Sequence, residues 1–135
     1  MNAAPVFLDT SALLALVHAG DSHHADVLAV LRRLERKAVP LVTHSYVLVE
    51  TGALVRKRFG NAPFRQVAGV VERSATVSWV DARLHREAWD KAAGTGRDGP
   101  GLVDWVSFLV MRRLSIATAV TLDKHFRDEG FRILP

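Results

Sequence analysis

Apolar residues follow two different periods along this chain. Short apolar runs, such as PVFL at 5–8 and PLVT at 40–43, have the length and composition of buried strands. Between these runs, longer segments repeat an apolar residue every three or four positions, which is the period of an amphipathic helix. The pattern predicts strands at 5–8, 40–43, 76–80, 119–122 and 131–134. It predicts helices at 11–19, 21–37, 45–59, 62–74, 82–93, 102–114 and 123–129.

Helix-breaking residues separate the predicted elements. Gly20, Gly60 and Gly94 each follow a predicted helix, and the glycine-rich segment GTGRDGPG occupies 94–101. Because strands alternate with helices, we expect an α/β fold, a three-layer α/β/α sandwich with a mainly parallel central sheet. No repeat or linker divides the chain, so residues 1–135 are predicted to form one domain. The candidate helix N-caps are Asp21, Asn61 and Asp81.

The composition is that of a soluble globular protein. Hydrophobic residues make up 49% and charged residues 24% of the 135 positions. Cysteine is absent, which excludes disulfides, thiolate metal sites and a cysteine nucleophile. The N-terminal segment MNAAPVF has no feature of an export signal, and the most apolar stretch, GLVDWVSFLVM, is interrupted by Asp104. We therefore expect a cytoplasmic protein with no membrane partner.

The chain is basic, with a formal charge of +4 and a pI near 10.1. This balance favours a polyanionic partner. However, Arg56, Lys57 and Arg58, like Arg112 and Arg113, fall where predicted helices end, and cations at such ends complement the helix dipole. The sequence leaves both interpretations of each basic cluster open.

Two aspartates stand directly at the ends of predicted strands. Asp9 follows PVFL, and Asp123 follows AVTL. In an open parallel sheet ligands bind beyond the carboxyl ends of the strands, so both positions are candidates for a functional site. Either aspartate could instead be a helix N-cap, which is the role expected of Asp81 after TVSWV.

Two further carboxylates fall on helix faces that are expected to pack inward. Asp104 lies in a helix that is apolar nearly all round, on the same face as Phe108. A buried carboxylate needs a partner, which an arginine could also provide, because desolvating the charge is unfavourable. Glu50 is predicted to lie mid-helix at the centre of the inward face, close on the helical wheel to Tyr46, Val47, Ala53 and Leu54.

These four carboxylates can converge on one pocket. Four such charges would repel one another, and some would take up protons, unless a cation neutralised them. Oxygen-only ligands of this type suit Mg²⁺, or alternatively Mn²⁺, and not zinc. The adjacent His23 and His24 lie on different helix faces and have no metal-ligand spacing. Neither a phosphate-binding loop nor a GxSxG nucleophile motif is present.

Four segments of the chain resemble the successive signatures of PIN-domain ribonucleases: VFLDTSALLAL, VLVETGAL, GLVDWVSFLVMRRLSI and AVTLDKHFRDEGFRIL. They stand in the family's order, cover nearly the whole chain, and are most similar to VapC-type toxins of toxin–antitoxin pairs. The resemblance implies a Mg²⁺-dependent endoribonuclease. The family's acidic quartet falls on Asp9, Glu50, Asp104 and Asp123.

Further residues are expected around this quartet. We expect one or two metal ions, with Asp9 as the central ligand because strand ends are rigid. Glu50 and Asp104 are expected to contact the metal directly or through water, and one of them to accept the proton of the attacking water. Asp123 is expected to hold the second metal or its waters. Thr10 and Ser11, at the start of the next helix, are expected to donate hydrogen bonds to phosphate. Lys57 follows Glu50 by two helical turns, and we predict that Lys57 and Arg112 border the site and contact RNA.

The resemblance also implies partners, namely an RNA substrate, a cognate antitoxin that covers the acidic site with Arg or Lys, and a second copy in a homodimer.

Some positions depart from the family pattern. Gly101, Leu102 and Val103 stand where Ser or Thr often precedes the third acid, and Trp105 replaces a commonly smaller residue. Whether Asp98, which resembles an additional acid of some members, or His125 takes part in the site remains open at this stage.

Other functions fit the sequence less well. A receiver domain needs paired acids after its first strand, and an aspartyl phosphatase needs an Asp-x-Asp pair, whereas Asp9 is followed by Thr10 and Ser11. A nonenzymatic RNA-binding or protein-interaction module on the same fold would be expected to have lost an acid. A housekeeping RNA-processing PIN nuclease is the alternative within the nuclease class.

Overall fold

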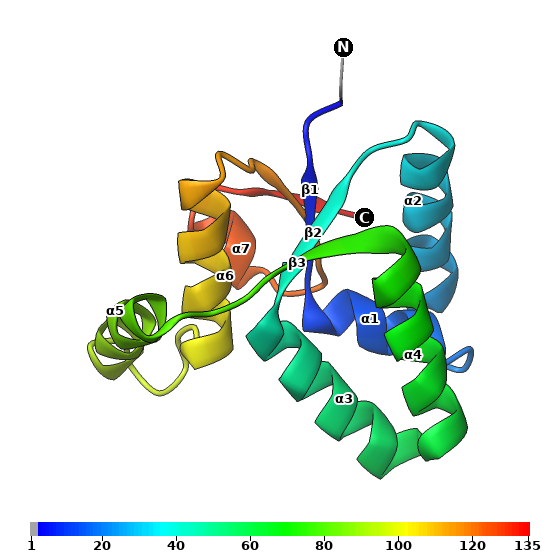
Figure 1. The fold of residues 1–135 in the computed structure, drawn as a ribbon, viewed down its shortest axis with the longest axis horizontal. Coiled ribbons are helices and arrows are strands. Elements are labelled where there is room, and N and C mark those ends of the chain that lie inside the picture. The colour runs from blue at the N-terminus through cyan, green and yellow to red at the C-terminus, as the bar shows by residue number, and fades with distance from the viewer. Residues whose placement is uncertain (1–2) are drawn as a thin grey trace.

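Five parallel strands form the central sheet of residues 3–135, the part of the chain that the computed structural model describes (Figure 1). The first two residues of MNAAPVF lie outside the described residues. The predicted strands and helices are all present; the helices at 45–59 and 82–93 have the predicted ends, and the other elements differ by at most three residues at either end. The strands are β1 (Val6–Leu8), β2 (Leu41–His44), β3 (Ala75–Ser78), β4 (Thr118–Val120) and β5 (Arg132–Leu134). The helices are α1 (Thr10–Val17), α2 (His24–Arg36), α3 (Ser45–Phe59), α4 (Asn61–Ser74), α5 (Ala82–Ala93), α6 (Leu102–Arg113) and α7 (His125–Asp128).

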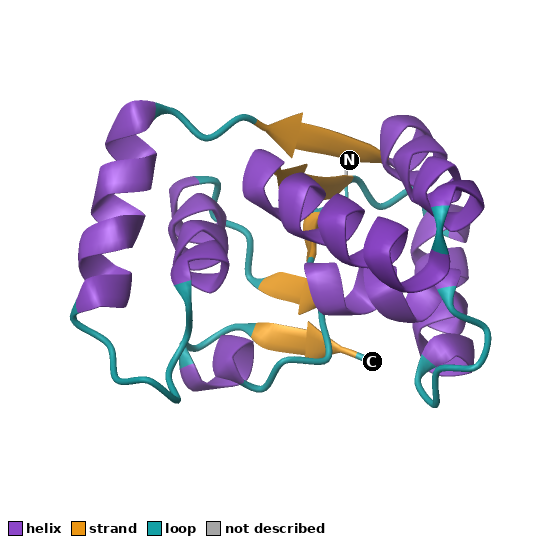
Figure 2. Cartoon of the chain, turned by 90° about the horizontal axis from the view of Figure 1, so that it is seen from below, coloured by secondary structure: helices purple, strands orange, loops and turns teal. Residues whose placement is uncertain are grey.

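The strand order is β3-β2-β1-β4-β5, and every neighbouring pair is parallel. Parallel neighbours need a crossover connection, which helices supply here on both faces. Helices α1 to α4 cover one face of the sheet and α5 to α7 the other (Figures 1 and 2). This arrangement confirms the predicted three-layer sandwich. The strand order reverses between β1 and β4, so their carboxyl ends form the topological switch point at which ligands bind in such sheets.

The core follows from the apolar runs. All three residues of β1 are buried, and Phe7 stacks against Phe126 with ring centroids 6.2 Å apart. In α6 the buried stretch extends without interruption from Val106 to Met111, because this helix packs against both the sheet and α5. Within residues 3–135, no helix is long and apolar enough to cross a membrane.

The predicted helix caps have different outcomes. Asp81 caps α5, since its Oδ1 accepts a hydrogen bond of 2.8 Å from the backbone N–H of Leu84. Asp21 lies outside α2 and instead closes the preceding turn by accepting from the N–H of His23. The prediction for Asn61 was wrong, because Asn61 is already helical. Gly60 precedes it with φ of 89°, a left-handed value that favours glycine.

Candidate metal-binding active site

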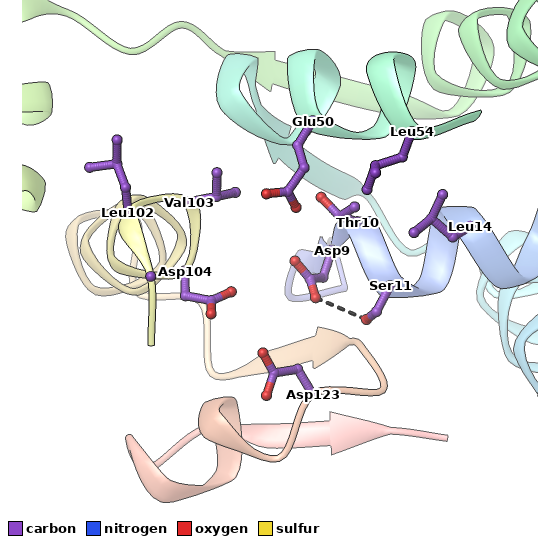
Figure 3. Close-up of a pocket in the computed structure, with 11 residues that line it drawn as sticks. Asp9, Thr10, Ser11, Leu14, Glu50, Leu54, Leu102, Val103, Asp104 and Asp123 are labelled. Carbon is purple, nitrogen blue, oxygen red and sulfur yellow. Dashed lines mark hydrogen bonds between the residues drawn. The ribbon is translucent and has the colours of Figure 1, made fainter. Parts of the chain in front are cut away.

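A cavity of about 460 Å³ lies beyond the carboxyl ends of β1 and β4, bordered by α1, α3 and α6. All four predicted acids line it. Figure 3 shows their carboxylates turned toward a common space, with Glu50 coming from α3, Asp104 from α6, and Asp9 and Asp123 from the strand ends. The remaining lining residues are Thr10, Ser11, Leu14, Leu54, Gly101, Leu102 and Val103.

Asp9 is buried at the junction of β1 and α1, with 3% of its surface exposed. It occupies the N-cap position of α1, yet its side chain makes no capping hydrogen bond. Instead Oδ2 accepts hydrogen bonds from Ser11 Oγ at 2.9 Å and from Thr121 Oγ1 at 2.8 Å. Burial raises the pKa of Asp9, and these two hydroxyl donors partly offset that rise. The geometry therefore does not support the interpretation of Asp9 as a cap.

A hydroxyl network joins the ends of β1 and β4. Thr121 Oγ1, which donates to Asp9, accepts a 3.0 Å hydrogen bond from the backbone N–H of Asp123. Ser11 Oγ likewise accepts from the N–H of Leu122 at 2.9 Å. Thr121 was not predicted as a site residue. The sequence shows a hydroxyl residue two positions before Asp123 in an otherwise apolar predicted strand. This hydroxyl cannot be assigned to Asp9 until it is known that β1 and β4 are neighbours in the sheet.

The two predicted phosphate donors differ in their surroundings. Ser11 donates its hydroxyl proton to Asp9, so in this structure the proton is not directed at a ligand. Thr10 is 5% exposed, and its Oγ1 has no hydrogen-bond partner among the described residues. Because a buried polar atom is normally paired, Thr10 Oγ1 is the group that a ligand in the cavity would satisfy.

Asp104 lies in the first turn of α6, where Gly101 occupies the N-cap position and offers no side chain. Its pKa is raised to about 7, first by burial and then by the charges of Asp9, Asp123 and Glu50. The backbone of Gly101 offsets this only in part. The carboxylates are therefore close enough to disfavour one another's ionised forms.

Asp123 both closes a turn and joins the acidic cluster. Its Oδ1 accepts a 2.9 Å hydrogen bond from the N–H of His125 at the start of α7. The ring Nδ1 of His125 lies 3.0 Å from the same oxygen. One possible ligand atom from each of Asp104, Asp123 and His125 falls within 4.8 Å of the others. His125 thus lies beside the site, whereas Asp98 is exposed and does not line the cavity.

Glu50 lies in the cavity, but not at the centre of the buried face of α3. That face is formed by Val47, Thr51 and Val55, while Ala53 is exposed. Glu50 is half-buried, so the predicted position at the middle of the inward face was wrong. The reason is that α3 packs through a row of residues next to Glu50 and leaves its cavity-facing edge open to solvent.

Basic side chains do not neutralise the cluster. Across residues 3–135, no lysine or arginine nitrogen lies within 4.0 Å of any of the four carboxylates. The alternative of a buried ion pair with arginine is therefore not realised for Glu50 or Asp104.

Arg112 and Lys57 were both expected at the border of the site. Arg112 lies at the C-terminal end of α6, away from Asp104, where it pairs with Glu129 at 2.7 Å and covers the ring of Phe131. Neither Arg112 nor Lys57 lines the cavity, and their contact with RNA stays a prediction. Lys57 is exposed, one turn beyond the cavity-lining Leu54.

Trp105, which departs from the family pattern, anchors the glycine-rich segment. Its Nε1–H donates a 3.1 Å hydrogen bond to Thr95 Oγ1, and its ring meets Phe108 edge to face. Thr95 in turn donates to the carbonyl of Lys91 at the end of α5. The larger side chain therefore ties the loop before α6 to the body of the protein.

The fold and the acidic cavity define a class: a parallel α/β protein with clustered carboxylates at the switch point of its sheet. This chain belongs to the PIN-domain family, whose match covers residues 6–131. It is 35% identical over 130 residues to VapC20 of Mycobacterium tuberculosis (strain H37Rv), a 23S rRNA-specific endonuclease, covering 93% of this chain and 95% of that protein. VapC20 of the strain CDC 1551 / Oshkosh matches equally.

A solved structure agrees with these sequence matches. The crystal structure of Mycobacterium tuberculosis VapC20, described as a sarcin-ricin loop cleaving toxin, superposes with a TM-score of 0.82 and 31% sequence identity. The superposition covers 96% of this chain and 99% of that one. The resemblance expressed by the four sequence segments is therefore confirmed at the level of the family and the fold.

Proposed function

We propose that this chain is a metal-dependent endoribonuclease that hydrolyses RNA phosphodiester bonds as the toxin of a toxin–antitoxin pair. The observation that carries the proposal is the convergence of four carboxylates in one cavity of a PIN-domain chain, with no lysine or arginine paired to them among residues 3–135. RNA as the substrate class is supported by VapC20, which is named as a 23S rRNA endonuclease. A nonenzymatic module would not need all four acids, and no feature favours it here.

The residues present fit a hard divalent cation. The donors are all carboxylate oxygens apart from the adjacent His125, and oxygen ligands of this kind suit such an ion. Burial, and then the charges of the neighbouring carboxylates, raise the pKa of Asp104 to about 7, and a bound cation would favour its ionised form. We propose Mg²⁺, with Mn²⁺ as an alternative, held by Asp9, Asp104 and Asp123 with Glu50 completing the site. Such an ion lowers the pKa of a bound water and neutralises charge on the attacked phosphate.

The chain's own groups supply the remaining functions. Glu50, at the open edge of the cavity, is placed to accept a proton from the attacking water. Thr10 Oγ1 has no hydrogen-bond partner within residues 3–135 and lies at the N-terminus of α1, so it is placed to donate a hydrogen bond to a phosphate oxygen. Ser11 and Thr121 hold the carboxylate of Asp9 in a fixed orientation.

The decisive experiment compares Asp9→Asn with Asp81→Asn in cleavage of end-labelled RNA with and without Mg²⁺. The two variants make the same chemical change, but Asp81 only caps α5, and Asn caps nearly as well as Asp. Asp9→Asn should fold normally and lose most cleavage, while Asp81→Asn cleaves like the wild type. Cleavage by Asp9→Asn at the wild-type rate would contradict the assignment of Asp9 as a metal ligand of a nuclease.

Two protein partners follow from the proposed toxin function. A cognate antitoxin would neutralise the acidic cavity with Arg or Lys, and coexpression with the product of a neighbouring small gene should restore growth. A homodimer would cover exposed apolar side chains on α3 and α5. Val49 is 70% and Trp89 57% exposed, and the two helices are joined where Tyr46 Oη meets His85 Nδ1 at 2.5 Å.

A further inference from the structure

His44 is a buried histidine that the chemistry described above does not use. It is the last residue of β2, has no exposed surface, and stacks on Phe7 of β1 with ring centroids 5.6 Å apart. It immediately precedes α3, the helix that carries Glu50. A fully buried polar ring at this position requires hydrogen-bond partners for both of its nitrogens.

One ring nitrogen caps α3. Nδ1 of His44 accepts hydrogen bonds of 3.2 Å from the backbone N–H groups of Tyr46 and Val47. Caps of this kind are usually made by the oxygen of Ser, Thr, Asp or Asn. Because Nδ1 accepts from two N–H groups, it carries no proton, and the proton of the neutral ring must reside on Nε2.

The other ring nitrogen reaches α6. Nε2 lies 2.8 Å from Ser107 Oγ, and Ser107 donates its own proton to the carbonyl of Val103 at 3.0 Å. Nε2–H is therefore the donor to Ser107. Burial lowers the pKa of His44 to about 3, so the ring stays neutral and keeps this single tautomer.

This chain of hydrogen bonds connects the two helices that deliver acids to the cavity. Among residues 3–135, the bond between His44 Nε2 and Ser107 Oγ is the one side-chain hydrogen bond that joins segment 41–59 to α6. Val103, the endpoint of the chain of hydrogen bonds on α6, directly precedes Asp104, and His44 lies six positions before Glu50. The two acids come from helices on different faces of the sheet, and α6 also packs against α3 and against β2, the strand that ends in His44.

We propose that His44, acting through Ser107, is a positioning residue that sets the placement of Glu50 relative to Asp104 and thereby the affinity of the site for its metal. The metal part of this inference rests on the proposed function. His44 touches neither substrate nor metal. Its contribution is to hold two carboxylates in one register, as residues behind a metal site commonly do.

Two variants separate this link from the cap. Ser107→Ala removes the partner on α6 and keeps His44 as the cap. His44→Asn keeps a side chain that can cap α3 but is too short to reach Ser107. Val110→Ala is the matched control, because Val110 is buried on α6 in the cluster formed with α5 and takes part in none of the hydrogen bonds of the link.

Titration of the purified protein with Mn²⁺ alone, followed by calorimetry, gives the first readout. Both Ser107→Ala and His44→Asn should weaken binding by about tenfold, whereas Val110→Ala should lower the melting temperature and leave binding unchanged. The double variant should bind no more weakly than either single variant, because both remove the same link. Wild-type affinity in both single variants would overturn the proposal and leave His44 as a cap only.

A second readout needs no metal. In ¹H–¹⁵N spectra of the metal-free protein, Ser107→Ala should shift the amide resonances of Val47 and Glu50, whereas Val110→Ala should not. Unshifted α3 amides in Ser107→Ala would refute the link. If the wild type bound no Mn²⁺, the proposed metal-dependent function would fail, while these amide shifts would still decide whether His44 couples α3 to α6.

Discussion

Thr121 Oγ1 donates a 2.8 Å hydrogen bond to Asp9 Oδ2 across 112 positions of sequence. The contact exists because β1 and β4 are neighbours in the sheet and end at the same edge. The same hydroxyl accepts from the N–H of Asp123, so one side chain holds two of the four acids. This relationship makes Thr121 part of the site although it offers no charge.

Thr121→Val should move the pH dependence of RNA cleavage upward. The hydroxyl lowers the pKa of Asp9 against the effect of burial, so its loss raises that pKa further. Because the ionised carboxylate is the form that binds a cation, activity should begin to rise at higher pH than in the wild type. The measurement is kcat/KM against pH, with Thr121→Ser, which keeps the donor, as the control. Superimposable profiles for Val and Thr would show that the hydroxyl has no such effect.

Asp104→Asn should stabilise the metal-free protein in a pH-dependent way. The pKa of Asp104 is about 7 in the fold against a reference value of 3.8, so ionisation opposes folding above the lower value. The amide resembles the protonated acid. The melting temperature of the variant should therefore match the wild type near pH 4, exceed it increasingly toward pH 7, and keep its advantage above pH 7.

Saturating Mg²⁺ should narrow this difference in stability at pH 8, because it stabilises the wild type more than the variant. At a hundredfold excess over the dissociation constant, one site adds roughly 2.7 kcal/mol to the free energy of unfolding of the wild type. Asp104→Asn should gain much less. Thermal melts of both proteins at pH 4 and pH 8, with and without the ion, give the comparison. A difference in melting temperature that does not change with pH in the metal-free proteins would contradict the expected ionisation of Asp104.

Lys57→Ala should weaken RNA binding across sequences and reduce the dependence of log K on log salt by about one unit. Lys57 is exposed on α3, one turn beyond the cavity-lining Leu54, and we predict that it contacts a phosphate of bound RNA. Arg112→Ala provides the comparison, because Arg112 is paired with Glu129 and lies away from the cavity. Binding is measured with Asp9→Asn as background to prevent cleavage. If the slope of log K against log salt were the same for Lys57→Ala and its parent, Lys57 would not contact RNA and would only complement the dipole of α3.

Trp89→Glu should dissociate the proposed homodimer. Trp89 is 57% exposed on α5, and its ring lies 5.6 Å from that of His85, which contacts α3. Placing a charge in a buried apolar interface is strongly unfavourable. Trp79→Glu is the matched control, because Trp79 is 75% exposed in the segment between β3 and α5, beside Arg113 and Leu114. Light scattering gives the mass, and a wild-type monomer at micromolar concentration would contradict the dimer.

The sequence by itself determined the elements and the kind of chemistry. Helices 45–59 and 82–93 were predicted to the residue, because apolar period, caps and breakers are local signals that a one-dimensional pattern carries. The strand-end positions of Asp9 and Asp123 were equally visible, since a parallel sheet brings its carboxyl ends to one edge. The residue types, all carboxylates in a chain without cysteine, already indicated a hard metal ion.

Only the tertiary structure decided which groups satisfy one another. The hydrogen bonds of Asp9 with Thr121 and of His44 with Ser107 join residues far apart in sequence, and they depend on strand order and helix packing. Glu50 was misplaced for the same reason, because the face a helix buries is set by its neighbours as well as by its own pattern. The ion pair of Arg112 with Glu129 likewise depends on how α6 packs against the C-terminal segment of the chain. Local periodicity encodes the elements, whereas the partners of a polar group are fixed only when distant segments pack together.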